Sequence, residues 1–130
     1  MWWLRTALGD LRTAQVLLRN ASLPPRGSAH FAQQAAEKAL KAAIASTGSE
    51  PTRTHDLVYL ALRGGSELRR ALAPIDIAVL SAVLARSRYP ERNDAPIGRD
   101  DATRWVVDAQ RVVEVVARHC DVDLESLSAA

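Results

Sequence analysis

Cysteine and histidine, the residues on which most metal and redox sites depend, are scarce in this sequence of 130 residues. Cys120 is the single cysteine, which excludes a disulfide within the chain and a cysteine-rich zinc site, and fits a reducing compartment. The three histidines, His30, His55 and His119, lie far apart, and no two have the i, i+4 spacing of a helical metal site. We therefore expect no metal ion and no cofactor.

Long apolar runs and the common catalytic motifs are also missing. The longest apolar stretch, IDIAVLSAVLA, is far shorter than the roughly 20 residues needed to cross a bilayer. The opening MWWLRTALGDLR is charged too early to hold the apolar core of a signal peptide. No Walker loop, GxGxxG or GxSxG occurs, which argues against hydrolases of the common kinds. The sequence predicts a soluble, cytoplasmic protein that does not associate with a membrane.

Lysine is rare even though the chain is basic, with 15 arginines and two lysines. This bias, with so much alanine, indicates a GC-rich genome, so scattered arginines are weak evidence of phosphate binding. The net charge of +2 is likewise too small to argue by itself for nucleic acid. Lys38 and Lys41, however, lie three residues apart in one predicted helix. This spacing makes that helix a candidate site.

Apolar residues recur at helical spacing along most of the chain, whereas no segment alternates as a strand would. We expect helices over residues 4–18, 28–46, 55–63, 74–86 and 101–118. The fold class predicted is all-α: an up-and-down antiparallel four-helix bundle with an additional short helix. Residues 1–120 should form a single domain, and residues 121–130 a weakly ordered C-terminal tail.

Several residues mark where these helices begin and end. Thr54 is a good N-cap for the third helix, and Gly64-Gly65 should end or kink it before a further turn or two in SELRRAL. Pro74 reads as the first residue of the fourth helix. Because that helix is apolar on nearly every side, we expect it to be the most buried element.

Polar residues on the second helix form one ordered stripe at i, i+3, i+4 and i+7: Gln34, Glu37, Lys38 and Lys41. The opposite side repeats the spacing with Ala32, Ala35, Ala36, Ala39, Leu40 and Ala43. The simplest interpretation is a solvated face with one ion pair between Glu37 and Lys41, worth a few tenths of a kcal/mol. The alternative is a face that meets a nucleotide or a partner protein.

Two short motifs, RTHDL and RYP, could join this stripe. Each has an ordinary interpretation: RTHDL is a capped helix start, and in RYP the proline, Pro90, holds Tyr89 out of helical geometry. If the second, third and fourth helices alternate in direction, however, the motifs meet at one end of the bundle. The polar corner would contain Lys41, Thr54, His55, Asp56, Arg86, Arg88 and Tyr89. Such a corner suits a phosphate-bearing ligand.

At these residues the chain resembles the HEPN family, the higher-eukaryote and prokaryote nucleotide-binding domains. The matching segments are AQQAAEKALKAAI, RTHDL and ARSRYPE, in this order across residues 4–118. The resemblance implies an all-α up-and-down bundle that is usually a homodimer, often with a partner nucleotidyltransferase encoded beside it. Some members are toxins of toxin–antitoxin pairs.

By similarity, the nucleotide-binding residues come from the helix-two stripe, the HD pair and the RYP motif with its preceding arginine. They are Glu37, Lys38, Lys41, His55, Asp56, Arg86, Arg88 and Tyr89. One departure matters: ribonuclease members carry an arginine followed, after four to six residues, by a histidine, and no arginine here has that spacing. Metal-free RNA cleavage needs such a general acid or base, so no catalytic residue is predicted.

Three functions remain open at this point. The first is a non-catalytic nucleotide-binding and partner-docking domain, acting with a small nucleotidyltransferase. The second is a ribonuclease-type toxin with an active site that the sequence does not reveal. The third is a dimerisation scaffold whose polar corner contacts only protein.

Overall fold

The computed structural model describes residues 1–88 and 96–129, which form six α-helices, one 3-10 helix and no strand. The helices are α1 (Trp2–Arg19), α2 (Arg26–Ala45), α3 (Leu57–Arg63), α4 (Ser66–Leu72), α5 (Ile77–Arg88) and α6 (Arg99–His119), followed by η1 (Leu124–Ser126). The prediction of an all-α protein is confirmed.

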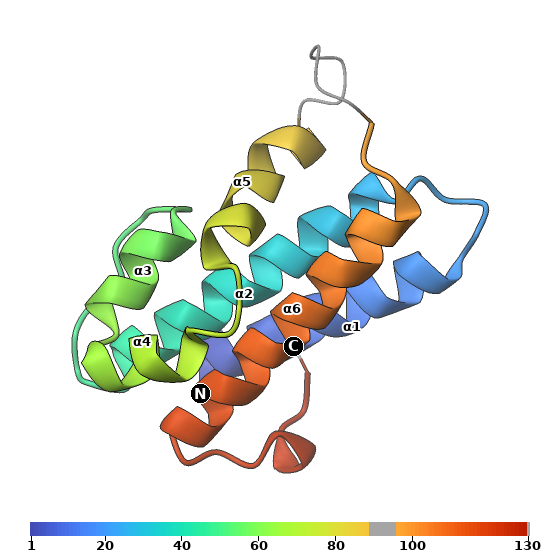
Figure 1. Cartoon of the computed structure of the whole chain (residues 1–130). Coiled ribbons are helices and arrows are strands. Elements are labelled where there is room, and N and C mark those ends of the chain that lie inside the picture. Colours follow the sequence, from blue (N-terminus) through green and yellow to red (C-terminus); the bar gives the residue numbers. More distant parts are fainter. Residues whose placement is uncertain (89–95, 130) are drawn as a thin grey trace.

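Helix α2 lies at the centre of the molecule and packs against α1, α3, α5 and α6 (Figure 1). Its alanines allow this, because small side chains let neighbouring helices approach closely. Six of them are fully buried: Ala29, Ala32, Ala35, Ala36, Ala39 and Ala43. Thirteen of the 20 residues of α2 are buried, which makes it the central element of the core.

The prediction that the fourth predicted helix, residues 74–86, would be the most buried element is wrong. This helix is α5, and only four of its 12 residues are buried, whereas Val79 is 47% exposed. The physical reason is its position: α5 packs chiefly on α2 and makes few contacts with α6, so only one of its faces is covered. Its outer face is apolar but open.

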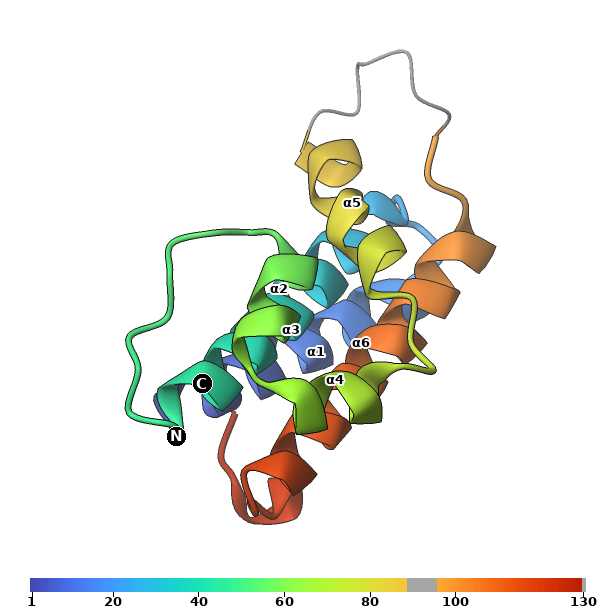
Figure 2. The same cartoon turned by 60° about the vertical axis from the view of Figure 1, so that its left-hand side comes forward.

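The direction of the helices also differs from the expectation. Helices α1 and α2 run in opposite directions, and so do α5 and α6 (Figure 1). After α2, residues 46–56 run back along this helix before α3 begins (Figure 2). The chain then turns sharply at Gly64-Gly65, between α3 and α4. Gly65 has a φ of +99°, which favours glycine. As a result α5 runs antiparallel to α2 and ends beside its N-terminal half.

Two predicted helix starts are wrong by a few residues, and in both an aspartate is the reason. The carboxylate of Asp56, not Thr54, caps α3, accepting from the N–H groups of Val58 (3.0 Å) and Tyr59 (3.3 Å). Pro74 precedes α5, which begins at Ile77 after Asp76 has accepted a bond from the N–H of Val79 (3.1 Å). A charged acceptor competes well for the free N–H groups of a first turn.

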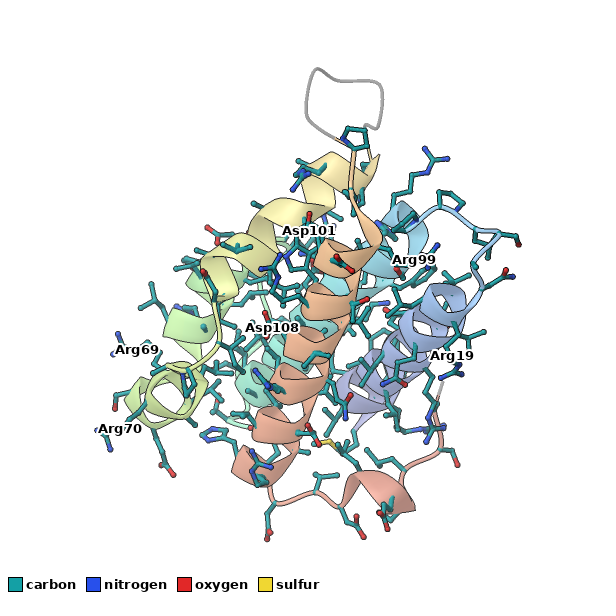
Figure 3. All side chains as sticks on the ribbon, turned by 45° about the vertical axis from the view of Figure 1, so that its right-hand side comes forward. Arg19, Arg69, Arg70, Arg99, Asp101 and Asp108 are labelled. Atoms are coloured by element: carbon teal, nitrogen blue, oxygen red, sulfur yellow. The ribbon has the colours of Figure 1, made fainter. Side chains whose placement is uncertain are left out.

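The ends of the bundle are tied together by arginines. Arg99 at the start of α6 donates to the carbonyls of Leu18 (2.8 Å) and Leu23 (2.9 Å), and so fixes the turn between α1 and α2 (Figure 3). Arg5 donates to the carbonyl of Ser128 (3.1 Å). The segment predicted as a weakly ordered tail thus contacts α1, and Leu124 packs against the core. The domain boundary at residue 120 stays a prediction.

None of the helices in the described part of the chain is both long and apolar enough to span a membrane.

Candidate functional site

One side of α2 stays partly open to solvent, and it carries the polar stripe. On the side next to α1, Lys38 contacts Asp10 and Lys41 contacts Trp3. On the opposite side, Glu37 contacts His55, just before α3, and His30 contacts α5. We call this the α2 strip, which consists of His30, Gln34, Glu37, Lys38 and Lys41. His30, Gln34 and Lys38 are partly exposed, whereas Glu37 and Lys41 are buried.

The middle of the α2 strip contains a buried carboxylate that holds two partners. The Glu37 side chain is 4% exposed; its Oε2 lies 3.1 Å from Nζ of Lys41, and its Oε1 accepts from Nδ1 of His55 at 2.8 Å. Gln33, fully buried one turn earlier, donates to the backbone carbonyl of His55 (3.3 Å). These bonds attach the start of α3 to α2. We call this group the Glu37 cluster, and its geometry is that of a structural clasp.

Lys41 is held on its other side by an aromatic ring. Its Nζ lies 5.5 Å from the centroid of Trp3, in cation–π geometry. With a carboxylate on one side and an indole on the other, the Lys41 side chain is only 10% exposed. The expectation that Lys41 lies near His55 is therefore met, but Lys41 presents little surface to a ligand.

The N-terminal half of the α2 strip forms a second, more open polar group. Nζ of Lys38 lies 2.6 Å from Oδ2 of Asp10 on α1, with the lysine 24% exposed. About two turns away along α2, Nδ1 of His30 lies 3.4 Å from Oγ of Ser87 on α5. Arg88 follows Ser87 and is exposed. We call His30, Lys38, Asp10, Ser87 and Arg88 the His30 cluster.

The surroundings of the His30 imidazole favour its neutral form. Burial lowers its pKa below the ordinary value, the positive charge of Arg88 lowers it further, and Asp10 acts in the opposite sense. The hydroxyl of Ser87 already donates its proton to the carbonyl of Leu84 (3.0 Å). His30 must therefore donate from Nδ1 to Ser87, which leaves the lone pair on Nε2. Such an imidazole can accept a proton or a hydrogen bond from a ligand.

The remaining predicted site residues have other roles or positions. Asp56 caps α3 and bonds to backbone N–H groups. Thr54 accepts a bond from the N–H of Asp56 (3.1 Å). The guanidinium of Arg86 lies 5.5 Å from the ring centroid of Trp105 on α6. Tyr89 and Pro90 lie outside the described residues, so their part in a site stays a prediction.

The single polar corner predicted from the sequence does not form. Lys41 and His55 meet at Glu37, but Arg88 lies beside His30, two turns closer to the start of α2. The prediction assumed that the second, third and fourth predicted helices alternate in direction. Because the chain turns at Gly64-Gly65, α5 ends beside the N-terminal half of α2. The residues expected at one site therefore lie in two groups, the Glu37 cluster and the His30 cluster.

His30 is a residue of the site that was not predicted, as are Asp10, Trp3 and Ser87. As a metal ligand His30 is too isolated in the sequence. Its position four residues before Gln34 extends the polar stripe by one turn, and this signal could have placed it on the same face. Among the described residues, no group of three or more histidine, cysteine or acidic side chains could hold a metal ion.

Comparison with known proteins places this architecture in a family. A family model for the HEPN domain matches residues 1–119, from α1 to the end of α6. The chain belongs to the HEPN domain family. This HEPN chain is similar to the crystal structure of TT1696 from Thermus thermophilus, with 28% identity and a TM-score of 0.74, over 89% of this chain and 94% of that one. No curated protein sequence matches it.

The burial of the Glu37 cluster predicts how strongly its members stabilise this HEPN fold. Glu37→Ala leaves the Lys41 ammonium buried without its counter-charge, so we expect the free energy of unfolding to fall by about 3–5 kcal/mol. Lys38→Ala breaks a more exposed pair and should cost about 1 kcal/mol or less. Chemical denaturation measures both. Equal, small losses in the two variants would show that Glu37 and Lys41 form an ordinary surface pair.

The lowered pKa of His30 predicts a pH effect on stability. A native imidazole that binds protons less readily than the unfolded chain favours unfolding on acidification. Its contribution is complete above the unfolded pKa, 6.5, and is lost as the pH falls towards the lower native pKa. We expect Tm to fall further between pH 7.5 and pH 5 in the wild type than in His30→Gln. Parallel curves for the two proteins would contradict this.

Proposed function

We propose that this HEPN protein is a non-catalytic nucleotide-binding and partner-docking module, built as an up-and-down bundle of α1, α2, α5 and α6 with α3 and α4 inserted. One observation carries the proposal: Lys38 lies partly exposed on the polar side of α2, and Arg88 is exposed beside the N-terminal half of that side. A ligand that lies along the α2 strip would meet Lys38 at one end of the His30 cluster and Arg88 at the other.

The two lysines contribute differently to binding. Lys41 is buried against Glu37 and Trp3, so it supports the strip rather than contacting phosphate. Lys38 is more exposed but shares its charge with Asp10. Arg88 is exposed and makes no ion pair with any described residue. Arg88 is therefore the stronger phosphate ligand, since its guanidinium can bind two phosphate oxygens at once.

An apolar surface on α3, α4 and α5 supports the docking part of the proposal. A shallow groove there is lined by Val58, Leu62 and Ile77 among others, and exposed Val79 adds to the apolar surface. Exposed apolar side chains gathered at one place are typical of protein contact surfaces. We propose that a second copy of the chain, giving a homodimer, or a small nucleotidyltransferase covers this groove. A cytoplasmic location is proposed with it.

The proposed phosphate site predicts which substitutions weaken nucleotide binding. In calorimetric titrations with ATP, without and with magnesium, Arg88→Ala should lose about ten- to a hundredfold in affinity, because one charge-assisted contact is worth roughly 1.5–3 kcal/mol. Lys38→Ala should lose less, since Asp10 already offsets its charge. Arg70→Ala is the matched control: it is an exposed arginine that extends away from the body on α4 (Figure 3).

Two results of this titration would overturn the phosphate site. One is an affinity for ATP that is the same in Arg88→Ala, Lys38→Ala and the wild type. The other is an equal loss in Arg70→Ala, which would indicate a general effect of net charge. Unchanged Tm values confirm that the variants are folded, so that a loss of binding is a property of the site.

A ribonuclease toxin is the second candidate, and one observation favours it. Although no arginine has the motif spacing to a histidine, His30 from α2 lies close enough to Arg88 for the guanidinium to lower its pKa. A neutral imidazole beside a guanidinium could act as a general base on a phosphodiester. We expect no cleavage of single-stranded RNA by the purified protein. Cleavage that is lost in both His30→Ala and Arg88→Ala would favour the toxin.

A further inference from the structure

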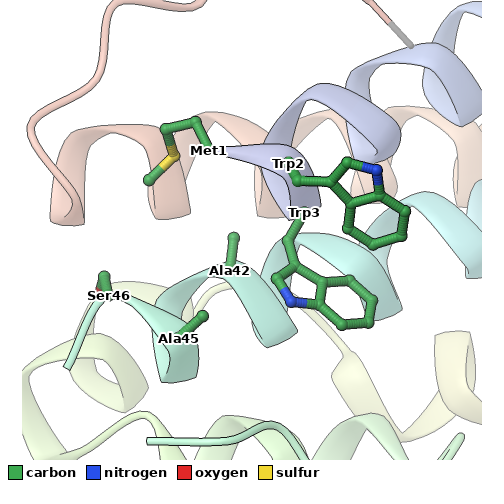
Figure 4. Close-up of a pocket in the computed structure, with 6 residues that line it drawn as sticks. All are labelled: Met1, Trp2, Trp3, Ala42, Ala45 and Ser46. Carbon is green, nitrogen blue, oxygen red and sulfur yellow. The ribbon is translucent and has the colours of Figure 1, made fainter. Parts of the chain in front are cut away.

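A small pocket lies where the start of α1 meets the end of α2, beyond the Glu37 cluster (Figure 4). It is lined by Met1, Trp2, Trp3, Ala42, Ala45 and Ser46. The two indoles are nearly perpendicular, with ring centroids 4.8 Å apart. Trp3 packs against the core, whereas Trp2 is 60% exposed. We call this site the tryptophan pocket.

The size of the tryptophan pocket limits what it can hold. Its volume of about 130 Å³ is well below the roughly 300–1,000 Å³ of pockets that enclose drug-sized ligands. There is room for one ring system, with the rest of the ligand outside. Trp2 is exposed, so its indole ring is accessible, and planar rings stack favourably on such surfaces.

The charges around the pocket select the kind of ring. Lys41 already places its ammonium over Trp3, so a cationic ligand would meet a positive charge beside the aromatic face. A neutral ring that carries an anionic group fits better. The lysines supply the complement, because Lys38 lies one helical turn, about 6 Å, before Ala42 along the same side of α2.

We propose that the tryptophan pocket is a nucleobase subsite. The base of a nucleoside phosphate stacks on Trp2 at the end of α2, and its phosphates run along the α2 strip past Lys38 towards Arg88. This inference rests on the proposed nucleotide-binding function and identifies its ligand class as a nucleoside polyphosphate. It also explains why a large aromatic side chain, Trp2, is exposed without packing against the core.

Trp2→Ala tests the subsite with little risk to the fold, because Trp2 is more than half exposed. Losing base stacking should weaken ATP binding roughly five- to a hundredfold. Trp2→Phe, which keeps a ring, should recover most of the affinity. Val16→Ala removes another exposed apolar side chain from α1 and should bind ATP like the wild type.

Intrinsic fluorescence reports on the pocket itself. Adenosine should quench the wild type more than Trp2→Ala, because Trp2 is 60% exposed, whereas Trp3 is partly buried against the core. Trp105 is 5% exposed on α6 and does not line the pocket. Inorganic triphosphate has no base, so it should bind the wild type and Trp2→Ala equally.

The ligands separate this inference from the proposed function. If triphosphate binds but ATP binds Trp2→Ala as tightly as the wild type, the base subsite is wrong and the phosphate site stands. If adenosine quenches Trp2 while Arg88→Ala and Lys38→Ala leave ATP affinity unchanged, the base subsite stands and the phosphate path is wrong. If neither ATP nor triphosphate binds, both fail.

Discussion

Close packing against the alanine face of α2 is the constraint on which the rest of this structure depends. Side chains as small as Ala35 and Ala39 let α1 and α6 approach the α2 backbone, and α5 and α3 cover part of what remains. A helix packed on so many sides has one direction left for polar groups, because burying charges without partners is costly. The polar stripe of α2 therefore follows from the way its apolar side packs.

Within that stripe, burial decides what each charge can do. Glu37 and Lys41 are desolvated, so each needs the other, and removing either leaves an uncompensated charge. Such a pair fixes the position of residues around His55 and is poorly suited to exchanging partners with a ligand. Lys38 is one turn away along the same helix, yet it is more exposed, and it is the lysine that we propose exchanges its carboxylate partner for a phosphate. Two lysines of one motif thus differ in burial and in their part in the proposal.

The sequence predicted the parts of the fold that depend on local periodicity. The helical spacing of apolar residues placed α1, α2 and α6 within a few residues of their ends, and the HEPN resemblance is confirmed by a match to residues 1–119. Helix boundaries at Asp56 and Ile77 were missed because several capping residues compete within a short stretch. The sequence also placed His55 near Lys41, and these two side chains meet at Glu37.

What the sequence could not predict is the direction of the chain between α2 and α5. Gly64-Gly65 is compatible with a kink in one helix or a turn between two, and the two outcomes send Arg88 to opposite ends of α2. The sharp turn brings Arg88 to His30, and it leaves the other end of α2 to Trp2 and Trp3. A cationic group and an aromatic group then lie at the two ends of one polar strip. This separation is the reason why we propose a ligand with a ring at one end and charge at the other, rather than a compact anion.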